Sequence, residues 1–331
     1  MKRKKRIIWI LILVGYFMFF TPVWLLRLVG YQDVIKTDLY PQWINNQELV
    51  YLKLVSYSDQ SPAGWGMYLP GDPFIIKSSN ADFFIYKVNV NNLDKKKLIK
   101  KFSKRVSFKA IDIKIRRLAK SLGLRLLEDG NIFFFAEKSS DYFAYLFNIK
   151  GRTLKRYKFD DRFFGTIGWN IIDISPNGEN LLSEHYYFYI KNIKLRKKDL
   201  LLEPLGMGDV RAKYITNNDI FINARVDLND PENIQVHSYT LFLTDIKTKE
   251  LKQVYFAKYK LDKLPSPFAC TFSPDSKYFA LSGEGVFAEI DSKWQKIKGF
   301  PYDLEFLSFS PDGKRIAGVD KAGKLKIVEL E

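Results

Sequence analysis

Three side chains that suit contact with a protein or a sugar lie together in one Gly- and Pro-containing stretch, SYSDQSPAGWGMYLPGDPF, residues 56–74. They are Trp65, Met67 and Tyr68. Aromatic side chains on a shaped loop are typical of binding surfaces, because they bury a large area and keep a polar edge. The stretch therefore predicts a partner-binding loop. The alternative is an ordinary surface loop whose aromatic side chains pack on the strands beneath it.

A second stretch, VDLNDPENIQVH (residues 226–237), carries three carboxylates: Asp227, Asp230 and Glu232. Carboxylates at short spacing are potential ligands of Ca²⁺ or another cation. This spacing matches no calcium loop of known type, and the alternative is a plain surface loop. We assign the three residues to ligand or partner binding and expect no resident metal.

Recognisable catalytic motifs are missing from the sequence. It contains no Gly-x-Ser-x-Gly, no phosphate-binding Gly-x-x-x-x-Gly-Lys, no His-Glu-x-x-His and no cysteine metal site. With only His185 and His237 present, we assign no catalytic residue and expect no cofactor. The single cysteine, Cys270, excludes an intramolecular disulfide and lies on an apolar strand, where we expect a buried structural thiol.

Carboxylate chemistry stays open at this point. Glycoside hydrolysis needs only two carboxylates, about 5 Å or about 6.5–9.5 Å apart, and the chain has 37 Asp and Glu residues. Two functions are therefore kept: a non-catalytic module that binds a protein or a cell-envelope polymer, which we favour, and a carbohydrate-active enzyme. Two carboxylates converging at one cavity would indicate the enzyme. A basic or aromatic surface without them would indicate binding.

Basic charge is unevenly distributed along the chain. The net charge is +16, and between Lys95 and Arg125 there are 13 basic residues against one acidic residue, Asp112. An anionic lipid surface or an envelope polymer is the partner that this charge suggests; the alternative is that lysines protect exposed strand edges. Nucleic acid is a weaker candidate, because no known docking motif is present. The residues assigned to anionic-surface binding are Lys95, Lys96, Lys97, Lys100, Lys101, Lys104, Arg105, Arg116 and Arg117.

The N-terminus predicts a membrane anchor. Residues 1–6 are basic after Met1, and the uncharged run from Ile7 to Leu26 is long enough to cross a hydrocarbon core of about 30 Å. We interpret residues 7–29 as an uncleaved signal anchor with residues 1–6 in the cytoplasm, so that the rest of the chain lies outside it. A cleaved signal peptide is the alternative, although no small-x-small cleavage site is present.

A turn motif recurs between apolar strands. FSPDGKRIAGV (309–319), ISPNGENLL (174–182) and FSPDSKYFALS (272–282) carry it well, and residues 43–54, 126–137 and 214–226 are weaker copies. Proline presets φ for a turn, and Asp, Asn and Gly suit the positions that follow. The pattern predicts six hairpins.

Each of these hairpins is followed by a second one that ends in a short basic strand. The copies are residues 83–102, 145–159, 187–202, 239–256 and 286–300, and the last repeat stops after its third strand, 324–331. Six repeats of about 48 residues of four antiparallel strands predict an all-β propeller domain over residues 31–331. The expected blades are 42–102, 104–159, 165–202, 208–256, 266–300 and 302–331, the last closed by residues 31–37.

Two further expectations follow from this fold. The fourth strand of each blade is outermost in a propeller, so the basic clusters would lie on its perimeter. Residues 104–127 mix the spacing of a strand with that of a helix, and we read them as the first strand of blade two beside a short basic helix.

The repeated Ser-Pro-Asp-Gly turn resembles the propeller repeats of TolB-like and WD-repeat-like proteins and of the propeller domains in prolyl-oligopeptidase-type enzymes. The resemblance covers most of the chain beyond residue 40. It implies a fold and leaves the activity open, because propellers carry many unrelated functions.

Overall fold

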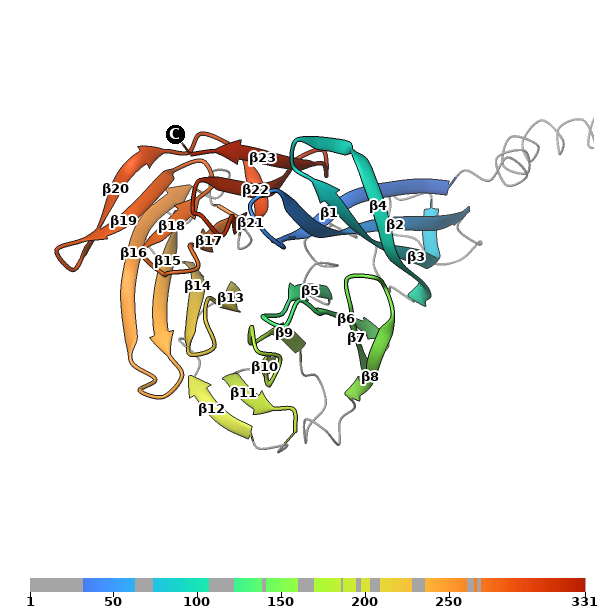
Figure 1. Ribbon diagram of the computed structural model, residues 1–331, viewed down its shortest axis with the longest axis horizontal. Helices are drawn as coiled ribbons and strands as arrows, with labels where there is room; N and C mark the ends of the chain where they lie inside the picture. Colours follow the sequence, from blue (N-terminus) through green and yellow to red (C-terminus); the bar gives the residue numbers. More distant parts are fainter. Residues whose placement is uncertain are drawn as a thin grey trace, which may run out of the picture. The chain divides into compact units, whose positions relative to one another are not determined.

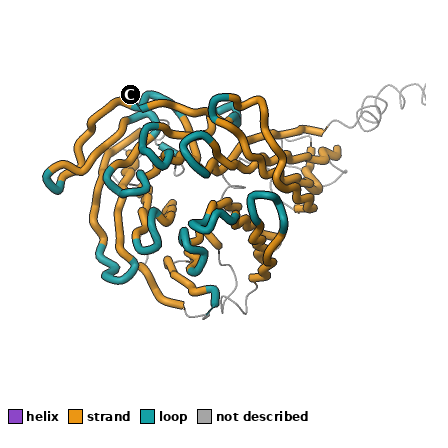
Figure 2. The backbone as a smooth tube through the Cα atoms, in the orientation of Figure 1, coloured by secondary structure: helices purple, strands orange, loops and turns teal. Residues whose placement is uncertain are grey.

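Every regular element that the computed structural model describes is a β-strand, and the strands form six antiparallel sheets (Figure 1). The described residues are 32–62, 74–106, 122–138, 141–159, 170–185, 187–194, 198–202, 209–227, 236–260, 265–266 and 269–330. Figure 2 shows these strands and the turns that join them.

The sheets follow one another in chain order, and each is a blade of four or three strands. Blade one contains β1 (Gln32–Trp43), β2 (Glu48–Pro62), β3 (Phe74–Asn89) and β4 (Asn92–Val106). Blade two contains β5 (Leu122–Leu126), β6 (Ile132–Lys138), β7 (Asp141–Phe147) and β8 (Thr153–Phe159). Blade three contains β9 (Asn170–Ile174), β10 (Asn180–His185), β11 (Tyr187–Asn192) and β12 (Lys198–Leu202).

The remaining blades have the same order of strands. Blade four contains β13 (Asp209–Tyr214), β14 (Asp219–Asp227), β15 (Val236–Asp245) and β16 (Leu251–Lys260). Blade five contains β17 (Cys270–Phe272), β18 (Tyr278–Leu281), β19 (Gly285–Ile290) and β20 (Lys293–Gly299). Blade six contains β21 (Leu304–Phe309), β22 (Arg315–Asp320) and β23 (Leu325–Glu329).

The chain divides into two compact units. The larger unit comprises Lys36–Leu54, Phe83–Phe102 and Lys114–Glu331, and it contains residues of all six blades. The smaller unit comprises Met1–Ile35, Val55–Asp82 and Ser103–Ile113, and its described residues belong largely to the ends of the four long strands of blade one. All contacts discussed below lie within the larger unit.

Consecutive blades of the larger unit share apolar cores. Blades two and three share one core, three and four a second, four and five a third, and five and six a fourth. Blades one and two meet where the Phe83 and Phe134 rings lie 5.6 Å apart. Blades six and one meet where Trp43 Nε1 donates a hydrogen bond to the Ser308 carbonyl oxygen at 2.9 Å. The contacts return to blade one, so the six blades form a closed propeller ring.

The six predicted turns are confirmed, and the Ser-Pro turns share one geometry. In blade six the Ser310 hydroxyl lies 2.5 Å from Asp312 Oδ1 and accepts a hydrogen bond from Arg315 N at 2.9 Å. Blade three repeats this arrangement with Ser175 in the serine position, and blade five with Ser273. The serine thus satisfies the backbone at the start of the second strand, which is why the motif marks each first hairpin.

The fourth turn position has a positive φ in all three motifs. It is Gly178 at 74° and Gly313 at 71°, but Ser276 at 60°. A residue with a Cβ is strained by about 1 kcal/mol or more in this region, whereas glycine is not.

We expect Ser276→Gly to raise the free energy of unfolding by up to about 1 kcal/mol, because it removes this strain and a buried hydroxyl that has no hydrogen-bond partner in the described structure. Gly313→Ala should lower it by about 1 kcal/mol through φ alone, since a Cβ there would meet no atom within 4 Å. Urea unfolding of both variants tests this. An opposite sign at either position would contradict the shared turn geometry.

The join between the two ends of the ring involves the first residues of the larger unit. Asp38 N donates to the Gly323 carbonyl oxygen at 2.8 Å, in the turn between β22 and β23. Residues 32–37 belong to β1, whose hydrogen-bonded neighbour in its sheet is β2, and blade six has three strands among the described residues. The assignment of residues 31–37 as the fourth strand of blade six stays a prediction.

Two other expectations lie partly or wholly outside the described residues. The first strand of blade two is β5, at the end of the ambiguous segment, while residues 107–121 are outside the description. The predicted anchor, residues 7–29, is also outside it. Among the residues that are described, no helix has the length and apolar character needed to span a membrane.

Candidate functional site

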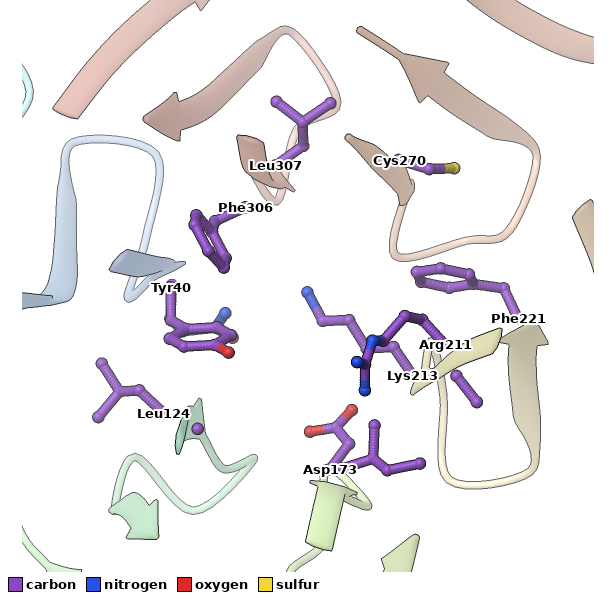
Figure 3. A pocket seen from close by; sticks show the side chains of 13 residues that line it. Tyr40, Leu124, Asp173, Arg211, Lys213, Phe221, Cys270, Phe306 and Leu307 are labelled. Carbon is purple, nitrogen blue, oxygen red and sulfur yellow. The ribbon is translucent and has the colours of Figure 1, made fainter. Parts of the chain in front are cut away.

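The innermost strands of the blades line a cavity in the larger unit (Figure 3). Its volume is about 70 Å³, room for several water molecules. A wider cavity of about 230 Å³ adjoins it, and Gln42, Lys213 and Phe221 contribute to the lining of both. We call the two together the channel. The inner cavity is lined by Tyr40, Gln42, Gly123, Leu124, Ile172, Asp173, Arg211, Ala212, Lys213, Phe221, Cys270, Phe306 and Leu307.

Two strained aromatic residues form one wall of the inner cavity. Tyr40 in β1 has φ = 51° and Phe306 in β21 has φ = 55°, and their rings meet edge to face at 4.9 Å. A positive φ is rare for a bulky residue. At Phe306 it coincides with a register shift in the β21–β22 pairing between Glu305 and Ser308. Such a bulge redirects a side chain, and here it presents Phe306 to the cavity (Figure 3).

A buried ion pair connects three blades beside this cavity. Arg125 Nη1 lies 3.3 Å from Asp173 Oδ2 and donates to the Tyr214 carbonyl oxygen at 3.1 Å. The same Asp173 oxygen accepts a hydrogen bond from Tyr214 N at 2.9 Å. Only 8% of Arg125 and 7% of Asp173 is exposed. The pair therefore holds β5, β9 and β13 together.

Lys213 supplies a further cation to the channel. Its side chain is half-buried and points toward the centre of the cavity (Figure 3). The pKa of Lys213 is lowered to about 8, chiefly by burial and also by the nearby Arg125 charge, while Asp173 partly opposes both effects. In the part of the chain that the structure describes, no carboxylate forms an ion pair with this ammonium group.

Two further titratable groups of the wall, the Tyr40 hydroxyl and the Cys270 thiol, are kept protonated by burial. Burial raises the pKa of the Tyr40 hydroxyl above its usual range. Burial likewise raises the pKa of the Cys270 thiol, which is 4% exposed. A thiol must ionise to act as a nucleophile. The prediction of a buried structural cysteine is confirmed.

The loop residues singled out from the sequence are not placed by the structure. Trp65, Met67, Tyr68, Asp230 and Glu232 lie outside the described residues. Asp227 ends β14 and is in register with His237 of β15, but its side chain is not described. The two loops stay predicted binding loops.

The basic residues assigned to an anionic surface fall on or after β4. Lys95, Lys96, Lys97 and Lys101 are exposed. Lys100 instead donates to the Gly151 carbonyl oxygen at 2.9 Å and to Thr153 Oγ1 at 3.1 Å, so it joins blades one and two. The side chains of Lys104 and Arg105 are not described, and Arg116 and Arg117 lie outside the described residues.

Sequence reasoning missed the channel residues Tyr40, Asp173, Arg211 and Lys213. A usable signal was present in DVRAKY, residues 209–214, where Arg211 and Lys213 lie on one face of a first strand. Because first strands are innermost in a propeller, charges with a period of two on such a strand indicate the channel lining.

No family model matches the sequence, and no curated protein matches it. Among solved structures, the chain is similar to one from a structural and mechanistic analysis of two prolyl endopeptidases, with 10% sequence identity and a TM-score of 0.38. The similarity covers 89% of this chain and 50% of that one, so the chain spans half the length of the peptidase. The propeller assignment rests on the sheet order and the closed ring of contacts. TolB-like or WD-repeat membership stays a prediction.

Proposed function

We propose that this protein is a non-catalytic binding module of the cell envelope, that residues 7–29 anchor it in the membrane, and that the perimeter of the propeller binds an anionic polymer. A protein partner on the loops that contain Trp65 and Asp227, or contact with anionic lipid, are the competing forms of the same binding role. The anionic polymer has the most support from the described residues.

The observation that carries the proposal is the charge of the outermost strands. The strands β8, β16 and β20 each carry three basic residues and no acidic one, and each is last in the hydrogen-bond order of its sheet. The exposed Lys95, Lys96, Lys97 and Lys101 continue this pattern on β4. Each of these strands also exposes one large apolar side chain: Leu98, Leu154, Phe256 and Ile297. We call these four strands the basic perimeter.

The distribution of the basic perimeter favours a flexible polymer over a flat surface. It extends over blades one, two, four and five. A planar bilayer can touch only neighbouring outer strands of a ring at one time, whereas a polymer chain can follow several. Long-range attraction between such charges and an anionic chain also raises the rate of association.

The glycoside hydrolase alternative lacks its required pair of carboxylates in the described channel. Asp173 is the one carboxylate among the residues that line the inner cavity, and none lines the wider one. Asp173 is already engaged with Arg125 and Tyr214. A general acid and a second carboxylate would both have to face the sugar, so this arrangement favours binding.

The perimeter prediction is tested with Lys95→Gln, Lys96→Gln and Lys97→Gln combined in the full chain, in detergent. Each lysine near an anionic surface contributes about 1 kcal/mol, so we expect binding of labelled hyaluronate, a carboxylated polysaccharide, to weaken by up to about 100-fold. The loss should shrink at high salt, because these charges are exposed and are screened. Fluorescence anisotropy measures the affinity.

The matched control removes the same charge from exposed turn lysines: Lys277→Gln, Lys314→Gln and Lys324→Gln. It should change hyaluronate affinity by no more than about twofold. If both triple variants lose the same affinity for hyaluronate, binding depends only on the net charge of the protein, and a site on the perimeter is ruled out. Shortening of the polysaccharide during incubation would overturn the non-catalytic assignment.

The anchor is tested separately by fractionation. The full chain should stay with membranes in alkaline carbonate, while a variant that lacks residues 1–30 should be released. Release of the full chain would contradict a spanning segment at residues 7–29.

A further inference from the structure

We propose that the inner cavity of the channel is a binding site for a small ligand with an anionic head, a carboxylate or a phosphate, on an apolar body. This site is separate from the basic perimeter, and the proposal does not depend on polymer binding. It gives a role to the charged residues of the channel and to the strained Tyr40 and Phe306, which take no part in polymer binding at the perimeter.

The first argument is the charge of the lining. Three cations, Arg125, Arg211 and Lys213, line the two parts of the channel, against the single described carboxylate of Asp173. The Arg125–Asp173 pair is neutral as a unit and is fixed by its bonds to Tyr214. No carboxylate of the described residues pairs with Lys213, so its ammonium group gives the lining a positive charge. An anion beside Lys213 would stabilise that charge in a partly buried site.

The second argument is the direction of the side chains. Arg211 and Lys213 are two residues apart on β13, so they lie on the same face of the strand. Figure 3 shows their charged groups on one side of the cavity and the ring of Tyr40 on the other. A guanidinium group presents a planar set of donors that fits carboxylate and phosphate oxygens. The Tyr40 hydroxyl is kept protonated by burial and can donate as well.

The third argument is the apolar remainder of the wall. Leu124, Ile172, Phe221, Phe306 and Leu307 complete the lining of the inner cavity. Small-molecule sites typically combine an apolar wall with a few converging polar groups. An anion with no apolar part would leave this wall in contact with water, so we infer a ligand that has both.

The fourth argument is backbone strain at the aromatic wall. Tyr40 and Phe306 keep positive φ values although neither is glycine. Strain of this kind persists where the surrounding structure enforces it, and it often occurs at ligand sites. Here the conformation brings both rings to the cavity.

The site makes a specific prediction about pH. The groups facing Lys213 are Arg125 on β5, Asp173 on β9, Arg211 on β13, Cys270 on β17 and Tyr40 on β1. In this environment the pKa of Lys213 is about 8. An anion binds the protonated ammonium, so affinity should be constant below pH 8. The affinity should fall by up to about tenfold per pH unit as the pH rises above the pKa of Lys213 in the ligand-free protein.

Isothermal titration of the full-length protein in detergent at pH 7 tests the proposal with two probes, benzoate and phenyl phosphate. Benzyl alcohol, which keeps the ring and lacks the charge, is the matched ligand control. We expect at least one anion to bind and benzyl alcohol not to bind. Benzoate alone would identify a carboxylate ligand, and phenyl phosphate alone a phosphate ligand.

Two variants locate the binding. Lys213→Gln should lower the affinity for the anion by about 10- to 100-fold, because it removes one charged hydrogen bond. Tyr40→Phe should lower this affinity less. Lys277→Gln, on an exposed turn, should leave the affinity unchanged. If Lys213→Gln does not fold, the fall of wild-type affinity above pH 8 replaces it as the test.

The proposal is overturned if neither anion binds the wild-type protein, if benzyl alcohol binds equally well, or if affinity is independent of pH between 7 and 9.5. Hyaluronate affinity measured on Lys213→Gln should equal that of the wild type. The triple perimeter variant should likewise bind benzoate or phenyl phosphate normally. Failure of the channel site and failure of the perimeter site are thus distinguished.

Discussion

Asp173→Ala is expected to lower the free energy of unfolding by about 3–5 kcal/mol, because it removes one partner of a buried ion pair and leaves the other uncompensated. The Asp173 oxygen receives hydrogen bonds from Arg125 Nη1 at 3.3 Å and from Tyr214 N at 2.9 Å. Without it, the buried Arg125 charge and a buried backbone N–H both lose their acceptor. The effect should be large because the three residues belong to three different blades.

Comparison with two further variants separates charge from hydrogen bonding. Asp173→Asn keeps an oxygen acceptor for Tyr214 N and loses the charge, so its cost should be smaller than that of Asp173→Ala. Arg125→Met combined with Asp173→Leu removes both charges, so it should recover the part of the loss that comes from the unpaired Arg125 charge. Tyr214 N still lacks its acceptor in this variant. Urea unfolding of the four proteins measures each free energy.

A cost below about 1 kcal/mol for Asp173→Ala would contradict this account. It would mean that water in the channel solvates Arg125 as well as the carboxylate does. A double variant that is no more stable than Asp173→Ala would show that the unpaired Arg125 charge is not the source of the loss.

The strand pairs could be predicted because their signals are local. Each Ser-Pro turn contains the serine that accepts the hydrogen bond and the residue with positive φ, all within six positions, as Ser310 to Arg315 show. The weaker turn at Thr216 uses the same device, since its hydroxyl accepts from Asp219 N at 2.9 Å. Counting these turns was enough to predict six blades and to place the basic strands outermost.

The channel site could not be predicted in the same way, because its residues meet only when the ring closes. Arg125 and the Tyr214 carbonyl oxygen are 89 positions apart in the chain. No local pattern reveals that Tyr40 and Phe306, on the first and last blades, take positive φ and that their rings meet edge to face. Sequence analysis favoured the loops near Trp65 and Asp227 because side chains on loops are usually exposed. Charged residues on an inner strand, in contrast, resemble the usual alternation of polar and apolar residues along any strand.

Trp43→Ala should lower the free energy of unfolding by about 3–5 kcal/mol, the usual cost of truncating a buried tryptophan. The Trp43 side chain is 8% exposed and packs with Leu49, Tyr51 and Val88 of its own blade and with Ala317 of blade six. Its indole N–H also donates to the Ser308 carbonyl oxygen at 2.9 Å. It therefore joins the first and last blades by both packing and hydrogen bonding.

Conversion to phenylalanine isolates the hydrogen bond, and Trp294 of blade five provides the matched control. Trp43→Phe keeps an aromatic ring and leaves the Ser308 oxygen without this donor, so we expect a loss of about 1–3 kcal/mol. Trp294 packs on Phe279 with ring centroids 5.1 Å apart, but its buried indole nitrogen has no hydrogen-bond partner in the described structure. Trp294→Phe removes an unsatisfied donor and should cost less than Trp43→Phe in urea unfolding. Equal costs would mean that ring closure at Trp43 depends on packing alone, and that the hydrogen bond to Ser308 contributes nothing to holding blades one and six together.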